Sequence, residues 1–395
     1  MLFLDLFAGV GGFRRGLELA GHKCVGFCEW DKYATASYTS MHCITEEQRA
    51  YLATLDLKQR QKEILKEKYR NGEFYSNDVR LIGRGNVPRA DIWTFGAPCQ
   101  DFSVAGHRKG LEGDRSSLVR EVFRAISELE EADRPEWLIY ENVKGMLSSN
   151  RGYDFAAILL EMEQLGYDIE WEVFNTKNFG IPQNRERVYT IGHTGKRGGK
   201  CKVFPLKTTD GKADISEINQ IGQWNNSTRK NPNQYRVYAP KGIAPTLNTA
   251  EGGGREPHIP VCVPVLTPER AEKRQNGRRF KDNGEEAFTL TSQDRHGVAV
   301  SVPSYDTGCD HEPITVTLET GEQLAAVWYE KYQCYIAIRK LTPRECFRLQ
   351  GWTDDYFDKA QFVNSDSQLY KQAGNGVTVA VVEEIGKAIA EVEKE

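Results

Sequence analysis

Residues 2–13 read LFLDLFAGVGGF, and this stretch decides the fold. Its mostly apolar first half favours a short buried strand, and Gly9, Gly11 and Gly12 follow directly. A strand that runs through glycines into a helix is typical of open α/β sheets, where the glycine backbone approaches a ligand closely. The stretch therefore predicts an α/β sheet with a ligand site at the carboxyl end of its first strand.

Three further apolar runs repeat this pattern. The runs are KCVGFCEW (23–30), ADIWTFGAP (90–98) and EWLIYENV (136–143), with helical patterns over 13–20 and 117–131 between them. Strand–helix alternation of this kind predicts a parallel sheet covered by helices on both faces.

Three other segments complete the organisation of the chain. A last helix is expected over 378–393, and the charged residues 44–70 are interpreted as a solvated helical insertion on the surface rather than a partner-binding helix. From residue 193 to 340 Gly, Pro, Asn and Thr rise and long helical patterns disappear. We therefore expect one α/β domain, residues 1–192 and 341–395, interrupted by a small β- and loop-rich domain, residues 193–340.

Composition limits the class of protein. The 395 residues suggest about two domains, and 39% hydrophobic with 27% charged residues is typical of globular chains. Residues 193–340 carry 21 Lys and Arg against 17 Asp and Glu, whereas the rest carries 31 against 39. A basic insert on an acidic body is consistent with a module that grips an acidic substrate. The opening residues lack the basic start of a signal peptide, and no apolar run is long enough to span a membrane.

The cysteines favour free thiols rather than disulfides or a metal site. Nine cysteines without regular spacing are typical of a reducing compartment. The potential ligands His22, Cys24, Cys28, His42 and Cys43 match no common zinc spacing, so no metal is expected.

Acidic residues follow the second and third strand regions. Glu29-Trp30-Asp31 stands about 16 residues beyond the glycines, where an acid accepts hydrogen bonds from ribose hydroxyls and a tryptophan covers an adenine face. Asp78-Val79 follows, where an acid accepts from an adenine amino group. Together these residues predict a cofactor containing adenosine, and a structural turn with surface acids remains the alternative.

Cys99 is the strongest candidate for a nucleophile. It follows Pro98 at the end of the run 90–98, the edge where α/β sheets place their sites. Glu141 ends the neighbouring run, either as a partner of Cys99 or as a capping glutamate. Gln183, Arg185 and Arg187 alternate as on one face of a strand, either aimed at a carboxylate and a pyrimidine oxygen or simply solvated.

These segments resemble the ordered motifs of the bacterial and phage DNA cytosine-5 methyltransferases. The matching segments are DLFAGVGGF, CEWD, the Pro-Cys-Gln loop, ENV, QNRERVY, LTPRECFRLQG (341–351) and YKQAGNGV (370–377), in family order. The resemblance covers most of 1–192 and 341–395. It implies a Rossmann-like class I methyltransferase sheet, and it implies that residues 193–340 are the target-recognition domain.

The resemblance also implies the roles of single residues. Cys99 would attack cytosine C6, Glu141 would hold N3 and the exocyclic amine, and Arg185 and Arg187 would support Glu141 and the cytosine O2. The C-terminal helix would return beside the glycine loop and complete the pocket for S-adenosylmethionine, although Gly376 stands where many members carry serine. The residues implied around the cofactor are Phe7, Ala8, Gly9, Gly11, Gly12, Glu29, Trp30, Asp31, Asp78, Val79, Pro98, Leu118, Asn375 and Val377.

Double-stranded DNA is the partner that the resemblance implies. A stacked base is out of reach, so the cytosine must be flipped out, and the glycine-rich loop 100–117 is suited to close over it. In the recognition domain the Thr-Leu segment 243–254 competes with 287–297 for the contact, and the cationic stretch 270–281 is either a phosphate contact or solvated. The residues implied at the DNA are Gln100, Ser103, Arg108, Lys109, Arg115, Gln183, Thr246 and Leu247.

Other enzyme classes fit less well. A tRNA cytosine-5 methyltransferase shares the scaffold, but its usual Cys-Phe-Thr signature is absent here. The Asp/Asn-Pro-Pro-Tyr loop of amino-methyltransferases is absent too, and a DNA-binding module without catalysis would not need Cys99 and Glu141. The Pro-Cys-Gln and ENV pair also argues against a nucleotide-dependent oxidoreductase. We expect a monomeric, cytoplasmic, prokaryotic or phage-encoded enzyme, with or without a partner restriction enzyme.

Overall fold

The computed structural model describes residues 1–97, 118–195, 202–208 and 334–394, with the shorter ranges 220–223, 236–238, 262–266, 287, 296–302, 314–317 and 323–329. The chain divides into two units. The first contains Met1–Ile181, Arg185–Thr209 and Pro343–Glu395, and the second contains Pro182–Asn184 and Asp210–Thr342. Residues 193–209 therefore belong to the first unit. None of the described helices is long and apolar enough to cross a membrane.

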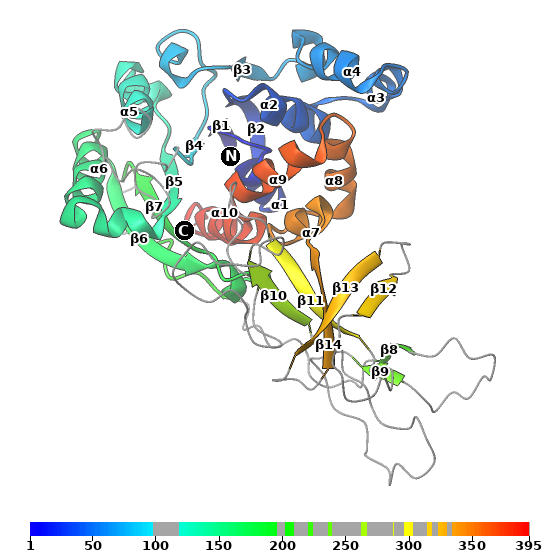
Figure 1. Ribbon diagram of the computed structural model, residues 1–395. Helices are drawn as coiled ribbons and strands as arrows, with labels where there is room; N and C mark the ends of the chain where they lie inside the picture. The colour runs from blue at the N-terminus through cyan, green and yellow to red at the C-terminus, as the bar shows by residue number, and fades with distance from the viewer. Residues whose placement is uncertain are drawn as a thin grey trace. The chain divides into compact units, whose positions relative to one another are not determined.

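A mixed sheet forms the centre of the first unit (Figure 1). Within the described residues its strands are β1 (Leu2–Leu6), β2 (Lys23–Cys28), β3 (Phe74–Ser76), β4 (Ile92–Phe95), β5 (Trp137–Val143), β6 (Asp168–Asn175) and β7 (Glu186–His193). They lie in the order β3-β2-β1-β4-β5-β7-β6. The four strands expected from the apolar runs are thus confirmed as β1, β2, β4 and β5.

The expectation of an entirely parallel sheet was wrong at one edge. Strands β1 to β5 pair in parallel, but β7 is antiparallel to both β5 and β6. Only residues 176–185 connect β6 to β7, and a parallel pair needs a crossover of a dozen residues or more. The chain therefore turns back and inserts β7 between β5 and β6.

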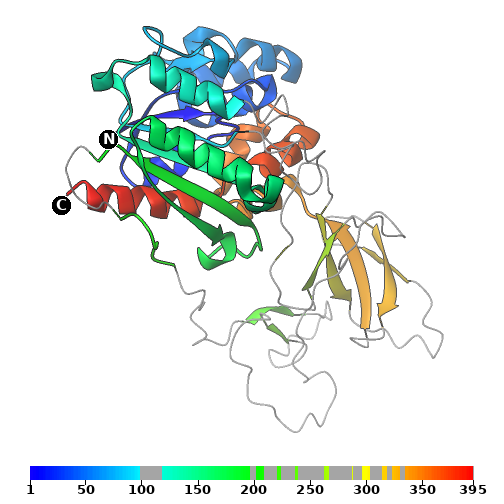
Figure 2. The same ribbon diagram turned by 90° about the vertical axis from the view of Figure 1, so that its left-hand side faces the viewer.

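Alternating side chains cover the two faces of the sheet with separate cores. In β1, Phe3 packs on one face and Leu4 and Leu6 on the other, and in β5 Trp137 and Leu138 divide in the same way. Helices α5 (Leu118–Glu128) and α6 (Tyr153–Gln164) cover the face of Leu4, as Figure 2 shows in teal and green. Near-continuous burial on both faces explains why these strands read as apolar runs.

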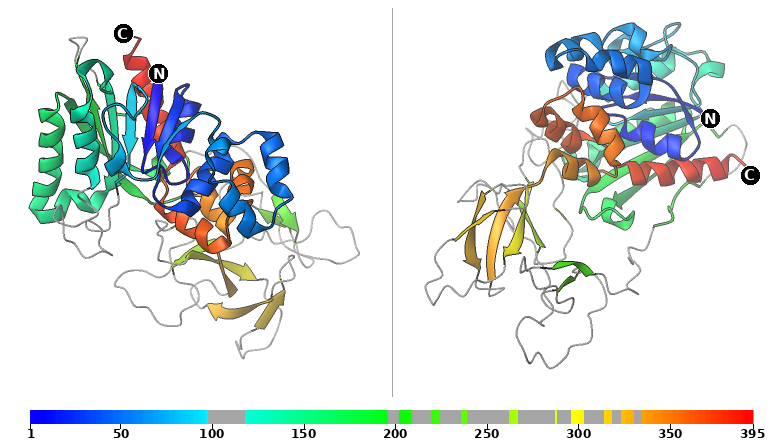
Figure 3. Two further views of the ribbon diagram at one scale, coloured as in Figure 1. Left: turned by 90° about the horizontal axis from the view of Figure 1, so that it is seen from above. Right: turned by 90° about the vertical axis from the view of Figure 1, so that its right-hand side faces the viewer.

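Helices α1 (Gly12–Leu19) and α10 (Val379–Val392) cover the opposite face and pack against each other (Figure 3). Glycines permit this close crossing, because a Cβ at Gly16 would lie 2.6 Å from the Val382 Cβ and one at Gly386 would lie 2.7 Å from the Ala20 Cβ. The expected C-terminal helix is confirmed, and it brings the end of the chain to its first helix.

The remaining helices of the first unit pack around the end of this sheet. Within the described residues they are α2 (Lys32–Tyr38), α3 (Glu46–Ala53), α4 (Leu57–Glu63), α7 (Pro343–Arg348), α8 (Asp354–Gln361) and α9 (Asp366–Asn375). Helices α3 and α4 start with capping boxes, Thr45 with Gln48 and Asp56 with Gln59. The segment 44–70 is therefore helical, as expected.

The same segment is more firmly anchored than a purely solvated insertion. Leu52, Ile64 and Tyr69 are buried in one apolar cluster with Val363. Arg60 donates to the Phe362 carbonyl and lies 3.9 Å from the centre of the Phe362 ring. The apolar residues are few and widely spaced, which is why the charged pattern around them dominates the sequence.

The second unit is antiparallel. Among its described residues, β10 (Cys262–Leu266), β11 (His296–Val302), β14 (Cys334–Lys340), β13 (Gln323–Tyr329) and β12 (Ile314–Thr317) form a sheet in that order, and β8 (Gln220–Gln223) pairs with β9 (Arg236–Tyr238). Ala326, Tyr335 and Ala337 form a small core with Ile314 and Trp328. The unit is built from short strands without a described helix, in keeping with its composition.

Candidate functional site

One carboxylate ties together the loops that follow β1 and β2. The Gly9 N–H donates to Glu29 Oε2 at 2.8 Å, and the Asp31 N–H donates to Glu29 Oε1 at 2.7 Å. The loop is tightly coiled, since Phe7, Gly9 and Gly11 have φ values of 53, 56 and 87°. Burial raises the pKa of Glu29, although these two hydrogen bonds act to lower it. Glu29, which the sequence predicts to bind a ribose, therefore fixes the glycine loop.

Trp30 and Asp78 stand beside this loop, and Arg80 links them. The Trp30 side chain is 71% exposed, so its ring is free to receive a flat ligand. Arg80 donates to both Asp78 oxygens, at 2.9 and 2.6 Å, and its guanidinium lies 5.6 Å from the Trp30 ring centre. Hydrogen bonding from Arg80 holds the pKa of Asp78 below its ordinary value. Nothing in the sequence pattern had singled out Arg80.

The C-terminal segment closes the same loop from the other side. A Cβ on Gly12 would lie 2.6 Å from the Val377 carbonyl oxygen, so only glycine fits there. Lys371 of α9 forms an ion pair with Asp31, with 2.5 Å between Nζ and Oδ2. Burial acts to raise the pKa of Asp31, but the Lys371 hydrogen bond outweighs it and the pKa is lowered. Asn375 is exposed between these contacts.

Glu141 lies at the end of β5 with an arginine and a glycine against it. Arg187 Nε is 3.0 Å from Glu141 Oε1, and both side chains are largely buried. A Cβ built on Gly96 would lie 3.3 Å from Glu141 Oε2. Gly96 follows β4 directly and stands three residues before Cys99 in the chain. The carboxylate therefore faces the strand end from which the Pro-Cys-Gln loop departs.

Gln183 and Arg185 precede β7, which begins at Glu186, so only Arg187 of the three lies in the strand. Arg185 is buried and donates to the carbonyls of Gly374 at 3.4 Å and Gly376 at 2.8 Å. Gln183 is fully buried and forms an isolated bridge with Ala287. The strand expected over QNRERVY is thus described only from residue 186, and the three side chains have different partners.

A second buried acid, Asp5, was not foreseen from the sequence. It is fully buried in β1, where Thr94 Oγ1 donates to its Oδ1 at 3.1 Å. Burial raises the pKa of Asp5 to about 8, against the lowering effect of the Thr94 bond and of Arg14. Within an apolar run a single acid gives no sign of which face it occupies.

Several expected site residues lie outside the described residues, and Leu118 lies partly buried at the start of α5. Those outside are Pro98, Cys99, Gln100, Ser103, Arg108, Lys109, Arg115, Thr246 and Leu247, together with the stretch 270–281. Among the residues that the structure does describe, no three His, Cys, Asp or Glu side chains gather as a metal site.

The sequence profile of C-5 cytosine-specific DNA methylases matches residues 1–391. The chain belongs to this family. A match over nearly the whole length includes the glycine loop, the Glu141 strand and the C-terminal segment. The DNA cytosine-5 interpretation is thereby supported over its tRNA alternative.

Relatives of this C-5 cytosine methylase come from phages and bacteria. The orphan methyltransferase M.SPBetaI of Bacillus phage SPbeta is 33% identical over 97% of this chain and 96% of its own. The type II methyltransferase M.HpaII of Haemophilus parainfluenzae is 31% identical over 98% of this chain and 89% of its own. Its relatives therefore include orphan methyltransferases and type II methyltransferases, and the second group belongs to restriction–modification.

Solved structures support the fold. The Entamoeba histolytica methyltransferase EhMeth has a TM-score of 0.54 at 15% identity, covering 100% of this chain and 99% of its own. The S. pombe methyltransferase Dnmt2 has a TM-score of 0.52 at 17% identity, covering 100% and 98%. The Rossmann-like methyltransferase architecture expected from the sequence is confirmed.

Proposed function

We propose that the chain transfers a methyl group from S-adenosylmethionine to C5 of a flipped-out cytosine, within a short specific sequence of double-stranded DNA. The observation that carries this proposal is the pairing of Glu141 with Arg187 beside Gly96, at the sheet edge where Glu29 holds the glycine loop. A base-binding carboxylate and a cofactor cradle at the ends of neighbouring strands are what such a transfer needs.

The glycine loop fits S-adenosylmethionine. Gly11, the N-cap of α1, has no side chain to cap the helix, and the Arg14 N–H bonds Asp5, so the first N–H groups of α1 are assigned to the cofactor carboxylate. A Cβ on Gly11 or Gly12 would clash with His42 or Val377, whereas nothing lies within 4 Å of a Cβ built on Gly9, so the loop is held by the protein and leaves space beside Gly9. Glu29 keeps free lone pairs for ribose hydroxyls, and the exposed Trp30 ring and Asp78 suit the adenine. The cofactor supplies an electrophilic sulfonium methyl group.

Each protein group then has a role in making C5 nucleophilic. The Cys99 thiolate adds to C6 while Glu141 holds N3 and the exocyclic amine and assists protonation at N3. Arg187 keeps Glu141 in place and contacts the cytosine O2. After C5 has taken the methyl group, loss of its proton expels Cys99 and restores the aromatic ring. Arg185 acts on the cofactor side of the site, through the carbonyls of Gly374 and Gly376.

DNA recognition falls to the second unit and to the loop 100–117. The basic excess of residues 193–340 comes from residues 193–209, which lie in the first unit, whereas residues 210–342 carry 16 Lys and Arg against 17 Asp and Glu. The role of the second unit therefore rests on its place in the family's segment order, and phosphate contacts fall to individual cations. The contacts proposed are the DNA residues named from the sequence, except Gln183, which is fully buried. We propose a monomer that acts in the cytoplasm of a bacterium, encoded by the host or by a phage.

The decisive experiment is methyl transfer from tritiated S-adenosylmethionine to unmethylated genomic DNA and, in parallel, to tRNA. Bisulfite sequencing of the DNA product identifies the modified base and the target sequence. We expect 5-methylcytosine at one short motif, and its complete loss in Cys99→Ser. Label in tRNA alone would favour the rival substrate, and label that survives Cys99→Ser would rule out the covalent mechanism.

A further inference from the structure

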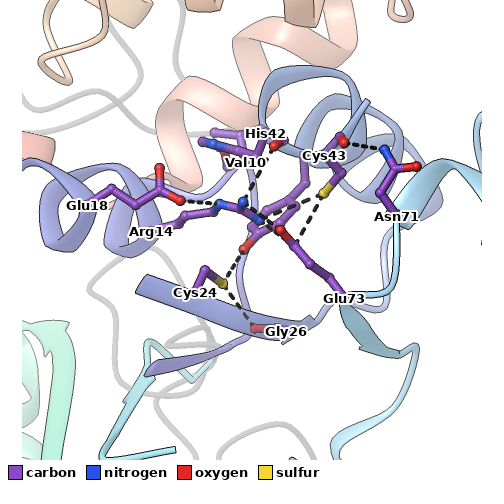
Figure 4. Close-up of polar contacts among 10 residues, drawn as sticks. Val10, Arg14, Glu18, Cys24, Gly26, His42, Cys43, Asn71 and Glu73 are labelled. Atoms are coloured by element: carbon purple, nitrogen blue, oxygen red, sulfur yellow. Dashed lines mark hydrogen bonds and ion pairs between the residues drawn. The ribbon is translucent and has the colours of Figure 1, made fainter. Parts of the chain in front are cut away.

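The glycine loop rests on a histidine that no motif includes. His42 Nε2 lies 3.0 Å from the Val10 carbonyl oxygen, as the close-up of Figure 4 shows. A carbonyl only accepts, so Nε2 carries the proton and donates it. A Cβ on Gly11 would lie 2.5 Å from the same nitrogen, so the ring packs directly under the loop. We propose that His42 is a positioning residue that sets the geometry of the cofactor loop.

The hydrogen bond acts on a single peptide plane. The Val10 carbonyl and the Gly11 N–H belong to one peptide unit, and the Gly11 N–H donates to the Ala8 carbonyl at 2.8 Å. Both polar atoms of this unit are therefore held, one by His42 and one by Ala8. Glu29 holds the preceding Gly9 N–H. With these points fixed, the N–H groups that open α1 have a defined direction toward a ligand.

His42 is itself held rigidly. It lies in a π-helical turn, Thr39–Cys43, a geometry common at functional sites. Its ring centre is 4.9 Å from that of Tyr38, 5.4 Å from Tyr356 and 6.0 Å from Trp352. Three aromatic rings thus keep the imidazole from rotating away from the loop.

The backbone of the turn is fixed from the opposite side by Arg14. Arg14 Nη2 donates to the His42 carbonyl at 3.4 Å, and its Nη1 and Nη2 pair with Glu73 at 2.6 and 2.8 Å (Figure 4). Arg14 also donates to Glu18 and to the Cys43 sulfur. This buried ion pair connects α1, the π-helical turn and the start of β3, so His42 is placed by elements far apart in the sequence.

The imidazole stays neutral at ordinary pH. Burial, followed by the cations Arg14, Arg15 and Lys359, holds the pKa of His42 well below its usual range. The other ring nitrogen, Nδ1, is buried with no hydrogen-bond partner. The role of His42 is therefore to donate one fixed hydrogen bond rather than to move protons, and it sets no pH dependence in a neutral assay.

His22 provides a matched control within the same chain. Its Nε2 also lies 3.0 Å from a backbone carbonyl, that of Gly386, and its Nδ1 is likewise buried without a partner. His22 follows the other end of α1, away from the glycine loop. Replacing either histidine by phenylalanine removes the same kind of hydrogen bond and keeps an aromatic ring.

The test measures the Kd of the full chain for S-adenosylmethionine by titration calorimetry, with KM, kcat and the melting temperature. The role of His42 rests on the proposed function, so cofactor binding by the wild type is measured first. We expect His42→Phe to raise Kd and KM for the cofactor about fivefold, the effect of one lost hydrogen bond, with kcat nearly unchanged. His42→Gln keeps an N–H donor and should stay within about twofold of the wild type. His22→Phe should lower the melting temperature and leave Kd unchanged.

The outcomes separate the two proposals. A wild type that binds, with His42→Phe changing Kd no more than His22→Phe, overturns the role of His42 and leaves the proposed function standing. A wild type that neither binds the cofactor nor transfers methyl groups overturns both. If His42→Phe does not fold, His42→Leu serves as the donor-free variant, with the same fivefold increase expected and an unchanged Kd contradicting the role.

Discussion

The carboxyl edge of the sheet has two halves that hold their acids in different ways. In the half formed by β1 and β2, Glu29 accepts from the backbone N–H groups of Gly9 and Asp31, and burial raises its pKa. In the half formed by β5 and β7, Glu141 pairs with the guanidinium of Arg187. One carboxylate organises backbone, whereas the other is held by a charged side chain.

The difference reflects what each half has to do. A loop that binds a cofactor needs fixed directions for its N–H groups, which hydrogen bonds to a carboxylate provide. A group that binds and protonates a base needs a defined charge and orientation, which an ion pair provides. Substitutions in the two halves should therefore separate cofactor affinity from the rate of transfer. Three predictions test this separation, and a fourth concerns the stability of the β1 half.

The largest effect is expected in the β5 half. Glu141→Gln keeps the shape of the side chain but removes the charge that pairs with Arg187. We expect kcat to fall about 100- to 10,000-fold, the usual contribution of general acid–base catalysis. The Kd for S-adenosylmethionine should stay within about twofold. A large change in this Kd would mean that the two halves are not separate.

The neighbouring arginines divide between the two halves. Arg187 contacts Glu141, whereas Arg185 holds the carbonyls of Gly374 and Gly376 next to Val377. We expect Arg187→Met to lower kcat by about thirtyfold, which corresponds to roughly 2 kcal/mol of lost transition-state stabilisation. Arg185→Met should mainly raise the cofactor Kd and lower the melting temperature. Single-turnover kinetics and calorimetry on both variants measure the split, and an equal effect on kcat would contradict it.

In the β1 half, Glu29→Gln replaces charge-assisted hydrogen bonds by neutral ones. Gln retains one oxygen for Gly9 or Asp31 but not two. The cofactor Kd should rise about tenfold while kcat at saturating cofactor changes little. Glu161→Gln, on α6 and bonded to Arg120 of α5, is the control, and its Kd should match the wild type.

The last prediction concerns stability beneath the glycine loop rather than cofactor affinity or the rate of transfer. Because burial raises the pKa of Asp5 to about 8, the folded protein retains a proton that the unfolded chain loses above about pH 4. The contribution of Asp5 to stability therefore falls between about pH 4 and 8 and is constant above this range. The Asn side chain of Asp5→Asn cannot ionise. The melting temperature of this variant, relative to that of the wild type, should therefore rise by about 2 °C or more from pH 5 to pH 8.

A surface substitution controls this measurement. Asp133→Asn, at an exposed position, should follow the wild type across the same pH range. A constant difference between Asp5→Asn and the wild type at all pH values would show that Asp5 is ionised in the folded protein.

Much of the fold was predictable because its signals are local. The strands β1, β2, β4 and β5 are buried on both faces and read as apolar runs, and the glycines after Leu6 mark the loop at the end of β1. The antiparallel β7 was not predictable in the same way. The direction of a strand depends on the length of its connection and on which position in the sheet is still unpaired. The residues of the strand itself specify neither.

The sequence by itself determined the family, the glycine loop and the order of the segments around it, because each depends on a short run of residues with its own backbone or chemical requirement. Only the tertiary structure decided which partners these residues meet. The approach of Val377 to Gly12, the division of Arg185 and Arg187 and the support of Val10 by His42 all join segments that are distant along the chain or lie outside any motif. Such contacts arise from packing, and packing is a property of the folded chain as a whole.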